Sequence, residues 1–211
     1  MGGTLAKYAA NHARVTLICA THGEAGIEGL VPEQAAIIRE RELRQAASAL
    51  GLDEVRFLDY RDGTLAQADA ERFIELLAGL MGKLHPDVVL TFGPDGISGH
   101  PDHVTLSERV TQAFDRAALP VSRLFYLAPS EATLQGCGVL PSQEVAGGPV
   151  ASIDITDYRL PKVRAMQAHA SQDPPYPGDP GEEAAKLTCH EYFTLARPIT
   201  ADGEMIDLFT H

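Results

Sequence analysis

The sequence predicts an α/β fold with a mostly parallel sheet, helices on both of its faces and a smaller, irregular C-terminal portion. Short apolar runs rich in β-branched residues alternate with longer segments of helical periodicity between residues 15 and 127. The 211 residues are enough to bury a core without disulfides, and 45% hydrophobic with 22% charged residues is ordinary for a globular protein. We therefore expect one domain over 1–211, with a core at 1–130 and a C-terminal portion at 131–211.

The N-terminal elements follow from local patterns. Residues 15–20 form a nearly continuous apolar run, which is typical of a buried strand. Residues 33–50 carry apolar side chains at helical spacing and are followed by Gly51, a residue type that commonly ends helices. A short helical segment is expected at 4–11 and a second strand at 55–58.

The central segment continues the same alternation. Residues 69–84 have an amphipathic helical pattern, and the apolar run 88–92 is the clearest strand of the chain. Residues 93–99 hold three glycines and a proline, which predicts a loop. A helix at 101–118 and a strand at 123–127 follow.

The C-terminal portion is less regular. We expect a strand at 150–155, a helix at 157–170 and a last strand at 191–196. Residues 173–181 contain four prolines and two glycines, which predicts a stiff irregular loop, a lid or a linker.

The composition excludes several classes of function. With 29 acidic and 17 basic residues the formal charge is −12, which disfavours binding to nucleic acid or anionic lipid. No apolar run approaches the ~20 residues of a membrane span, and the N-terminus lacks a secretion signal. Cys19, Cys137 and Cys189 lack CxxC spacing and fit a reducing compartment. We expect a cytoplasmic protein that could form a homo-oligomer, and the negative charge says little about a small substrate because a local pocket can oppose it.

The segment Gly99-His-Pro-Asp-His103 combines a helix start with two imidazoles. Pro101 suits the first helical position, and Asp102 complements the helix dipole, so a well-formed helix start is one interpretation. His100 and His103 are three residues apart and project to the same side, which favours a catalytic or metal-binding role. The segment is compatible with a simple helix start and with a catalytic or metal-binding role.

Other polar residues are candidates with simpler alternatives. His22 is expected to be exposed, and Glu24 is a plausible pocket carboxylate. Arg39 belongs to an alternating-charge stretch that predicts a solvated helix face, although one arginine there could reach an anionic or hydroxyl-rich substrate. Asp62 suits a turn, and His169 suits stabilisation of a helix end. Motifs of serine hydrolases, P-loop proteins and dinucleotide-binding proteins are absent from the sequence.

Several short motifs follow one another along nearly the whole chain. The most specific is Gly93-Pro94-Asp95-Gly96 leading into residues 99–103. In this order and spacing the motifs resemble those of the PIG-L / LmbE-like family of zinc-dependent de-N-acetylases, which act on N-acetylglucosaminyl substrates. The other matching segments are Gly2 to Ala6, Thr21 to Gly26, Arg39 with Glu42, Tyr60 to Gly63, Lys162 with His169 and Gln172, and Glu191 to Phe193.

The resemblance implies a Rossmann-like fold and hydrolysis of an N-acetyl amide on an N-acetylglucosaminyl-type substrate. It implies that His103 is a zinc ligand, and that His100, tuned by Asp102, stabilises the oxyanion and protonates the leaving amine. Ser98 stands where some members have a tyrosine near the scissile carbonyl. The residues expected to bind the substrate are Arg39, Asp62, Glu24, Ser98 and His169.

One family motif has no counterpart in this sequence. The family's first strand ends in a motif of the form A-H-P-D-D-E, which supplies a His and an Asp to zinc and a further Asp as general base. We expect these ligands, and a central strand between 15–20 and 88–92, to lie upstream of Met1 in a longer natural chain. The alternatives are a sugar-binding protein that has lost the metal and a domain completed by a partner's strand.

Overall fold

The computed structural model describes residues 1–119, 122–128, 150–173, 176–198 and 207–209. These residues form two compact units, Met1–Gly63 with Asp154–Glu191, and Thr64–Ile153 with Tyr192–His211. The single domain expected over 1–211 stays a prediction.

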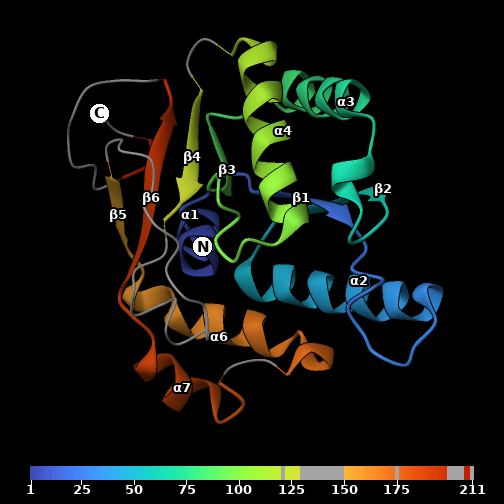
Figure 1. Cartoon of the computed structure of the whole chain (residues 1–211). Helices are drawn as coiled ribbons and strands as arrows, with labels where there is room; N and C mark the ends of the chain where they lie inside the picture. Colours follow the sequence, from blue (N-terminus) through green and yellow to red (C-terminus); the bar gives the residue numbers. More distant parts are fainter. Residues whose placement is uncertain (120–121, 129–149, 174–175, 199–206, 210–211) are drawn as a thin grey trace. The chain divides into compact units, whose positions relative to one another are not determined.

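The first unit is built around a parallel pair of strands (Figure 1). Strand β1 (Thr16–Thr21) pairs with β2 (Glu54–Tyr60), with Thr16 opposite Glu54. Helix α2 (Pro32–Leu50) connects them and ends at Gly51, whose φ of 74° lies in the left-handed region that glycine adopts without strain. The expected strands at 15–20 and 55–58 and the helix at 33–50 are thereby confirmed.

Three further helices belong to the first unit: α1 (Gly2–Ala10), α6 (Arg159–Gln167) and α7 (Pro180–Lys186). Helix α6 packs against each of α1, α2 and α7 (Figure 1). Buried Val163 on α6 packs with Ala184 on α7 and with Leu187. Residues 159–187 therefore pack with the N-terminal helices α1 and α2 in the first unit.

Two expectations for this region need correction. The helix expected over 157–170 is shorter, because 3₁₀ turns at Thr156–Tyr158 and Ala170–Gln172 flank α6. The irregular loop expected over 173–181 ends at Asp179, whose carboxylate accepts hydrogen bonds from two backbone N–H groups at the start of α7. An aspartate before a proline is a helix-start signal, which the high Pro and Gly content of this segment concealed.

The second unit contains a four-stranded sheet in the order β3-β4-β6-β5. Strand β3 (Val88–Phe92) runs parallel to β4 (Arg123–Leu127), and β6 (His190–Arg197) runs antiparallel to β4. Strand β5 (Val150–Asp154) lies at the far edge. The mostly parallel α/β architecture is confirmed, with β6 as the antiparallel strand.

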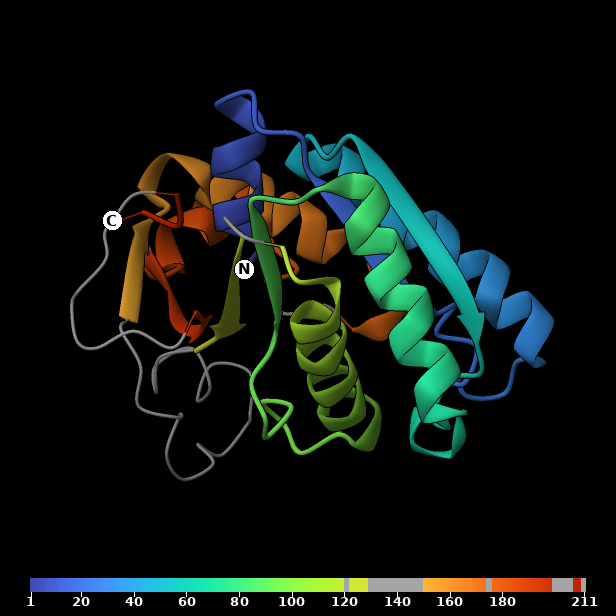
Figure 2. The same ribbon diagram turned by 90° about the horizontal axis from the view of Figure 1, so that it is seen from above.

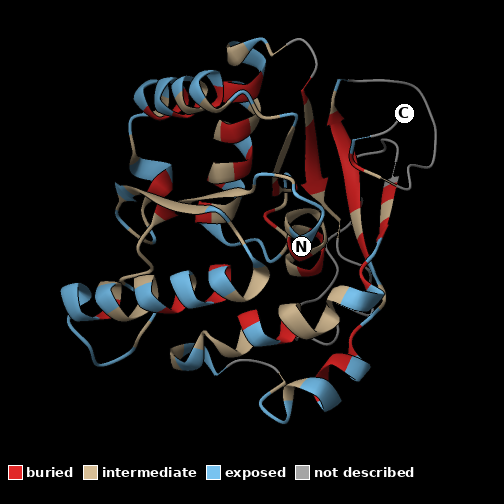
Figure 3. Ribbon diagram, turned by 180° about the vertical axis from the view of Figure 1, so that it is seen from behind, coloured by how far each residue is buried: buried red, intermediate tan, exposed pale blue. Residues whose placement is uncertain are grey.

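Helices α3 (Ala70–Leu84) and α4 (Pro101–Ala117) pack against each other in the second unit, and α4 also packs on β3 (Figure 2). Buried positions concentrate on β4 and β6 (Figure 3). Fully buried side chains of this core include Phe73, Leu124, Phe125, Ile153 and Phe193.

Strands β1 and β3 each have one hydrogen-bonded neighbour among the described strands. The central strand expected between them stays a prediction. Among the described helices, none is long and apolar enough to cross a membrane.

Candidate functional site

The predicted site residues fall into two groups, one in each unit. Ser98, His100, Asp102 and His103 belong to the second unit at the loop before α4 and its first turn. Glu24, Arg39, Asp62 and His169 belong to the first unit.

His100 caps the start of α4. Its Nδ1 accepts a hydrogen bond from the backbone N–H of Asp102, 3.2 Å away, and Pro101 occupies the first helical turn. The structure therefore confirms that this segment forms a well-capped helix start. Because Nδ1 accepts, the proton of the neutral ring sits on Nε2. The exposed ring can thus donate a proton or a hydrogen bond from Nε2.

His103 has the opposite proton arrangement. Its Nδ1 lies 3.3 Å from the carbonyl oxygen of Gly96, which can only accept, so Nδ1 carries the proton and Nε2 carries a lone pair. The ring stacks on Phe92 with centroids 4.1 Å apart, and lies 5.0 Å from the ring of His100. A metal-binding histidine commonly donates its other N–H to such a carbonyl.

Asp102 is 5% exposed and supports the loop before α3. Its Oδ1 accepts a hydrogen bond from the backbone N–H of Leu65, at 3.0 Å. A buried carboxylate in the first turn of α4 also complements the positive end of the helix dipole. Its expected influence on His100 stays a prediction. Ser98 is exposed, and its backbone N–H donates to the carbonyl of Gly96.

The described residues do not form a complete metal site. Within these ranges, no three His, Cys, Asp or Glu side chains group together in a way that could hold a metal ion. The carbonyl contact of His103 fits one zinc ligand, whereas catalytic zinc generally takes three from the protein. The described residues therefore supply one of the ligands that a catalytic zinc ion needs.

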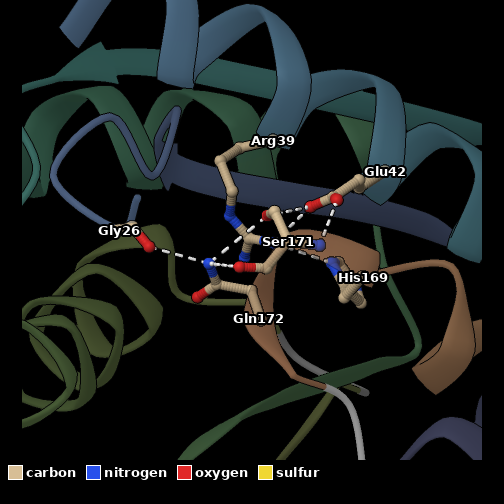
Figure 4. Close-up of polar contacts among 6 residues, drawn as sticks. All are labelled: Gly26, Arg39, Glu42, His169, Ser171 and Gln172. Atoms are coloured by element: carbon tan, nitrogen blue, oxygen red, sulfur yellow. Dashed lines mark hydrogen bonds and ion pairs between the residues drawn. The ribbon is translucent and has the colours of Figure 1, made fainter. Parts of the chain in front are cut away.

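The first unit holds a polar cluster that joins α2 to the turn after α6 (Figure 4). We call it the Arg39 cluster, and its members are Gly26, Arg39, Glu42, His169, Ser171 and Gln172. Arg39 Nη1 donates to Glu42 Oε2 at 2.6 Å and lies 3.2 Å from His169 Nδ1. Gln172 Nε2 donates to the Gly26 carbonyl at 2.7 Å.

Glu42 provides the carboxylate of the Arg39 cluster and is buried, at 5% exposure. It accepts hydrogen bonds from the backbone N–H of Ser171 at 2.7 Å and from the Ser171 hydroxyl at 2.8 Å. Burial raises the pKa of Glu42, but the Ser171 hydrogen bonds and the adjacent Arg39 outweigh burial and lower it. The solvated face expected for this part of α2 is thus wrong for Arg39 and Glu42, because the turn carrying Ser171 covers them.

His169 lies beyond the end of α6 and faces Arg39 (Figure 4). Burial and the positive charge of Arg39 lower the pKa of His169, although Glu42 acts in the opposite direction. Its ring is therefore neutral near pH 7. The expectation of simple helix-end stabilisation is corrected, because a charged imidazole is needed for that effect.

Glu24 and Asp62 hold each other's loops in place. Glu24 Oε1 accepts from the backbone N–H of Asp62 at 2.7 Å, and Asp62 Oδ2 accepts from the backbone N–H of Ala25 at 3.2 Å. Asp62 Oδ1 also accepts from the Thr21 hydroxyl. Within the described part of the chain, Glu24 Oε2 and Arg39 Nε are buried without a hydrogen-bond partner. Burying a polar atom without a hydrogen-bond partner costs free energy of folding. A simple turn does not require this cost, so these atoms support a functional role for the loop region.

His22 was expected to be exposed, and the structure corrects this. Its ring lies between two carboxylates, with Nδ1 2.7 Å from Glu40 Oε1 and Nε2 2.7 Å from Asp59 Oδ1. The ring also stacks on Phe57. Burial lowers the pKa of His22, but the hydrogen bonds and charges of Asp59 and Glu40 outweigh it, so the net shift is upward. The two carboxylates that contact His22 are 18 and 37 residues away in the sequence, so no local pattern could predict these contacts.

Lys162 and Glu191 entered the sequence analysis only as motif members, and the structure pairs them. Glu191 is 6% exposed and lies 2.8 Å from Lys162 Nζ. Its carboxylate also accepts from the backbone N–H groups of Gly3 and Thr4, and lies 3.3 Å from the Met1 amino group. Burial raises the pKa of Glu191, but these charges and hydrogen bonds prevail and lower it to about 2. Glu191 therefore caps helix α1.

Comparisons with known proteins show the family of the chain. The family model described as PIG-L: GlcNAc-PI de-N-acetylase matches residues 1–114. A 1D-myo-inositol 2-acetamido-2-deoxy-alpha-D-glucopyranoside deacetylase of Saccharomonospora viridis is 32% identical, with 99% of this chain and 93% of the relative aligned. A protein of the same description from Actinosynnema mirum is 33% identical, over 81% of this chain and 75% of the relative.

A solved structure shows the same likeness. The N,N'-diacetylchitobiose deacetylase of Pyrococcus horikoshii superposes with a TM-score of 0.66 and 26% identity, over 92% of this chain and 77% of that chain. These relatives are deacetylases, which are hydrolases that cleave an amide C–N bond. The expected family and class of enzyme are thereby confirmed.

Proposed function

Because the chain belongs to the PIG-L family of GlcNAc-PI de-N-acetylases, we propose that it removes the acetyl group from a small N-acetylglucosaminyl-type substrate. The observation that carries the proposal is the pair of imidazoles at the start of α4. Their rings lie 5.0 Å apart and have opposite proton arrangements, with Nε2–H on His100 and a lone pair on Nε2 of His103.

These two kinds of nitrogen suit amide hydrolysis. When water adds to the acetyl carbonyl, the oxygen becomes negative, and the amine must gain a proton before the C–N bond breaks. His100 would stabilise the oxyanion through Nε2–H, and after taking up the proton that the attacking water releases it would pass a proton to the leaving amine and return to the neutral ring. His103 would serve as one zinc ligand.

The first unit would bind the sugar. The charge of Arg39 and the polar groups of Glu24, Asp62 and His169 suit an amino sugar rich in hydroxyl groups. Ser98 would lie near the reacting carbonyl, and the expected cytoplasmic location belongs to the same proposal.

The test is acetate release by the protein as its own cells produce it, with its intact mass measured on the same sample. The substrates are 1D-myo-inositol 2-acetamido-2-deoxy-alpha-D-glucopyranoside and N,N'-diacetylchitobiose. We expect His103→Ala to abolish zinc binding and acetate release, and His100→Ala to reduce release about 100-fold or more while zinc still binds. His85→Asn is the matched control, because asparagine tolerates the left-handed φ of 47° at that helix end.

Other outcomes identify the alternatives. Sugar binding without acetate release and without sensitivity to a chelator would show a binding protein. A short peptide or second subunit that copurifies would show a domain completed by a partner. Full activity of His103→Ala would reject the assignment of His103.

A further inference from the structure

We infer that Glu42 is a positioning residue, which together with Arg39 fixes His169 as a neutral donor that presents Nε2–H to an oxygen atom of the bound sugar. The role toward sugar rests on the proposed function. The fixed proton position does not depend on that function, and it can be measured in the protein alone.

The first step is the assignment of the proton. A guanidinium group only donates hydrogen bonds, and Arg39 Nη1 lies 3.2 Å from His169 Nδ1. Nδ1 must therefore accept, and the single proton of the neutral ring resides on Nε2. The opposite tautomer would place two N–H groups against each other.

The second step is the part played by Glu42. Both of its oxygens are occupied, Oε1 by the Ser171 backbone N–H, and Oε2 by the Ser171 hydroxyl and Arg39 Nη1. Ser171 follows His169 by two residues, so one buried carboxylate holds both the guanidinium and the turn that carries the imidazole (Figure 4). Glu42 itself does not need to touch a ligand to act in this way.

The third step is what His169 can recognise. Within the described part of the chain, its Nε2 makes no hydrogen bond, and the ring is only partly buried. A neutral N–H next to a guanidinium attracts hydroxyl, carbonyl or carboxylate oxygens and repels cationic groups. A hydroxyl or an acetamido oxygen of an amino sugar has this chemistry.

The experiment uses ¹⁵N NMR of the histidine rings in the complete chain, which reports which ring nitrogen is protonated. In the unaltered protein we expect His169 to have a bare Nδ1 and a protonated Nε2 at pH 7 and above. We expect Glu42→Gln to produce a mixture of tautomers, because one amide oxygen cannot accept all three hydrogen bonds. Glu33→Gln is the matched control, since Glu33 is exposed on the same helix.

Binding of N,N'-diacetylchitobiose provides the second readout. We expect the sugar to shift the His169 Nε2 signal, and Glu42→Gln to weaken its affinity about tenfold, the size expected from one lost hydrogen bond. Ser171→Ala removes only the hydroxyl contact and should produce a smaller change in the same direction. It also serves as the test if Glu42→Gln does not fold.

Three outcomes would overturn the inference. A protonated Nδ1 of His169 in the unaltered protein would reject the tautomer. An unchanged tautomer in both Glu42→Gln and Ser171→Ala would reject the positioning role of Glu42. A sugar that binds without shifting Nε2 would reject the donor role. Loss of acetate release alone concerns the proposed function, because none of these signals requires turnover.

Discussion

The helix start at residues 99–103 and the Arg39 cluster are built in different ways. The two imidazoles at the helix start bond to residues two and seven positions away, His100 to Asp102 and His103 to Gly96, although Asp102 also bonds to Leu65. The Arg39 cluster also has local bonds such as Arg39 to Glu42, but three of its contacts join residues 129 to 146 positions apart: Ser171 to Glu42, Arg39 to His169 and Gln172 to Gly26. The helix start is thus specified locally, whereas the Arg39 cluster exists only in the folded first unit.

The two regions should also respond differently to substitution. The exposed ring of His100 makes one capping bond, so its removal should affect chemistry more than stability. Buried carboxylates such as Glu42 and Glu191 hold several donors at once, and their removal leaves buried groups unpaired.

The largest effect is expected for Glu191→Ala, which tests how far the first unit depends on long-range contacts. Loss of a buried ion pair and a helix cap should reduce the free energy of unfolding by about 3–5 kcal/mol. Urea denaturation and hydrogen exchange of α1 would measure it, with exposed Glu182→Ala as the control. A loss no greater than in Glu182→Ala would contradict the capping role.

Lowering the pH should reduce the stabilisation that Glu191 provides. The folded pKa of Glu191 is about 2, against an ordinary value of 4.5. Because the folded pKa is lowered, the stabilisation is complete above the ordinary value and is lost as the pH falls from there toward 2. Glu191→Gln should show a smaller loss of stability over this range of pH.

Gly96→Ala is expected to have the next largest effect, and it tests the local construction of the helix start. An added Cβ would lie 2.9 Å from both the Cβ of His103 and the backbone nitrogen of Val104, at a φ of +65°. We expect a loss of about 3 kcal/mol and a displaced His103 ring. Gly99→Ala is the matched control, because its φ is +72° but its Cβ would meet open space. Equal losses in the two variants would exclude the clash.

Asp102→Ala should come third, at about 2 kcal/mol, because it leaves the buried backbone N–H of Leu65 without this acceptor. Asp102→Asn keeps an oxygen for that bond and should lose less. Hydrogen exchange at Leu65 would follow the contact directly. If exchange there is unchanged in Asp102→Ala, the contact does not stabilise this loop.

The smallest effect is expected for His22, whose partner Asp59 is largely exposed. Since the folded pKa of His22 is raised, its ion pairs stabilise the first unit below pH ~6.5 and weaken as the pH rises through the folded pKa. The contribution should stay below about 1 kcal/mol. His22→Gln should flatten the pH dependence of stability between pH 6 and 9, and an unchanged slope would contradict this assignment.

The sequence predicts most of the fold because its elements are locally encoded. Apolar runs such as 88–92 match the observed strand, and Gly51 ends α2 as expected. Helix α7 was not predicted, because the Pro and Gly residues at its start are typical of a loop. The cap that Asp179 provides was the signal for this helix. Glu42, Ser171 and Glu191 have roles that no local pattern predicts, because their partners come from distant parts of the chain.

The cap of α1 also has a consequence for synthesis. Gly3 at the start of the helix and the Glu191 carboxylate that caps it are 188 residues apart. A ribosome releases the chain from its N-terminus, so α1 emerges long before its cap exists. Helix α1 can therefore receive this cap only after Glu191 has been translated.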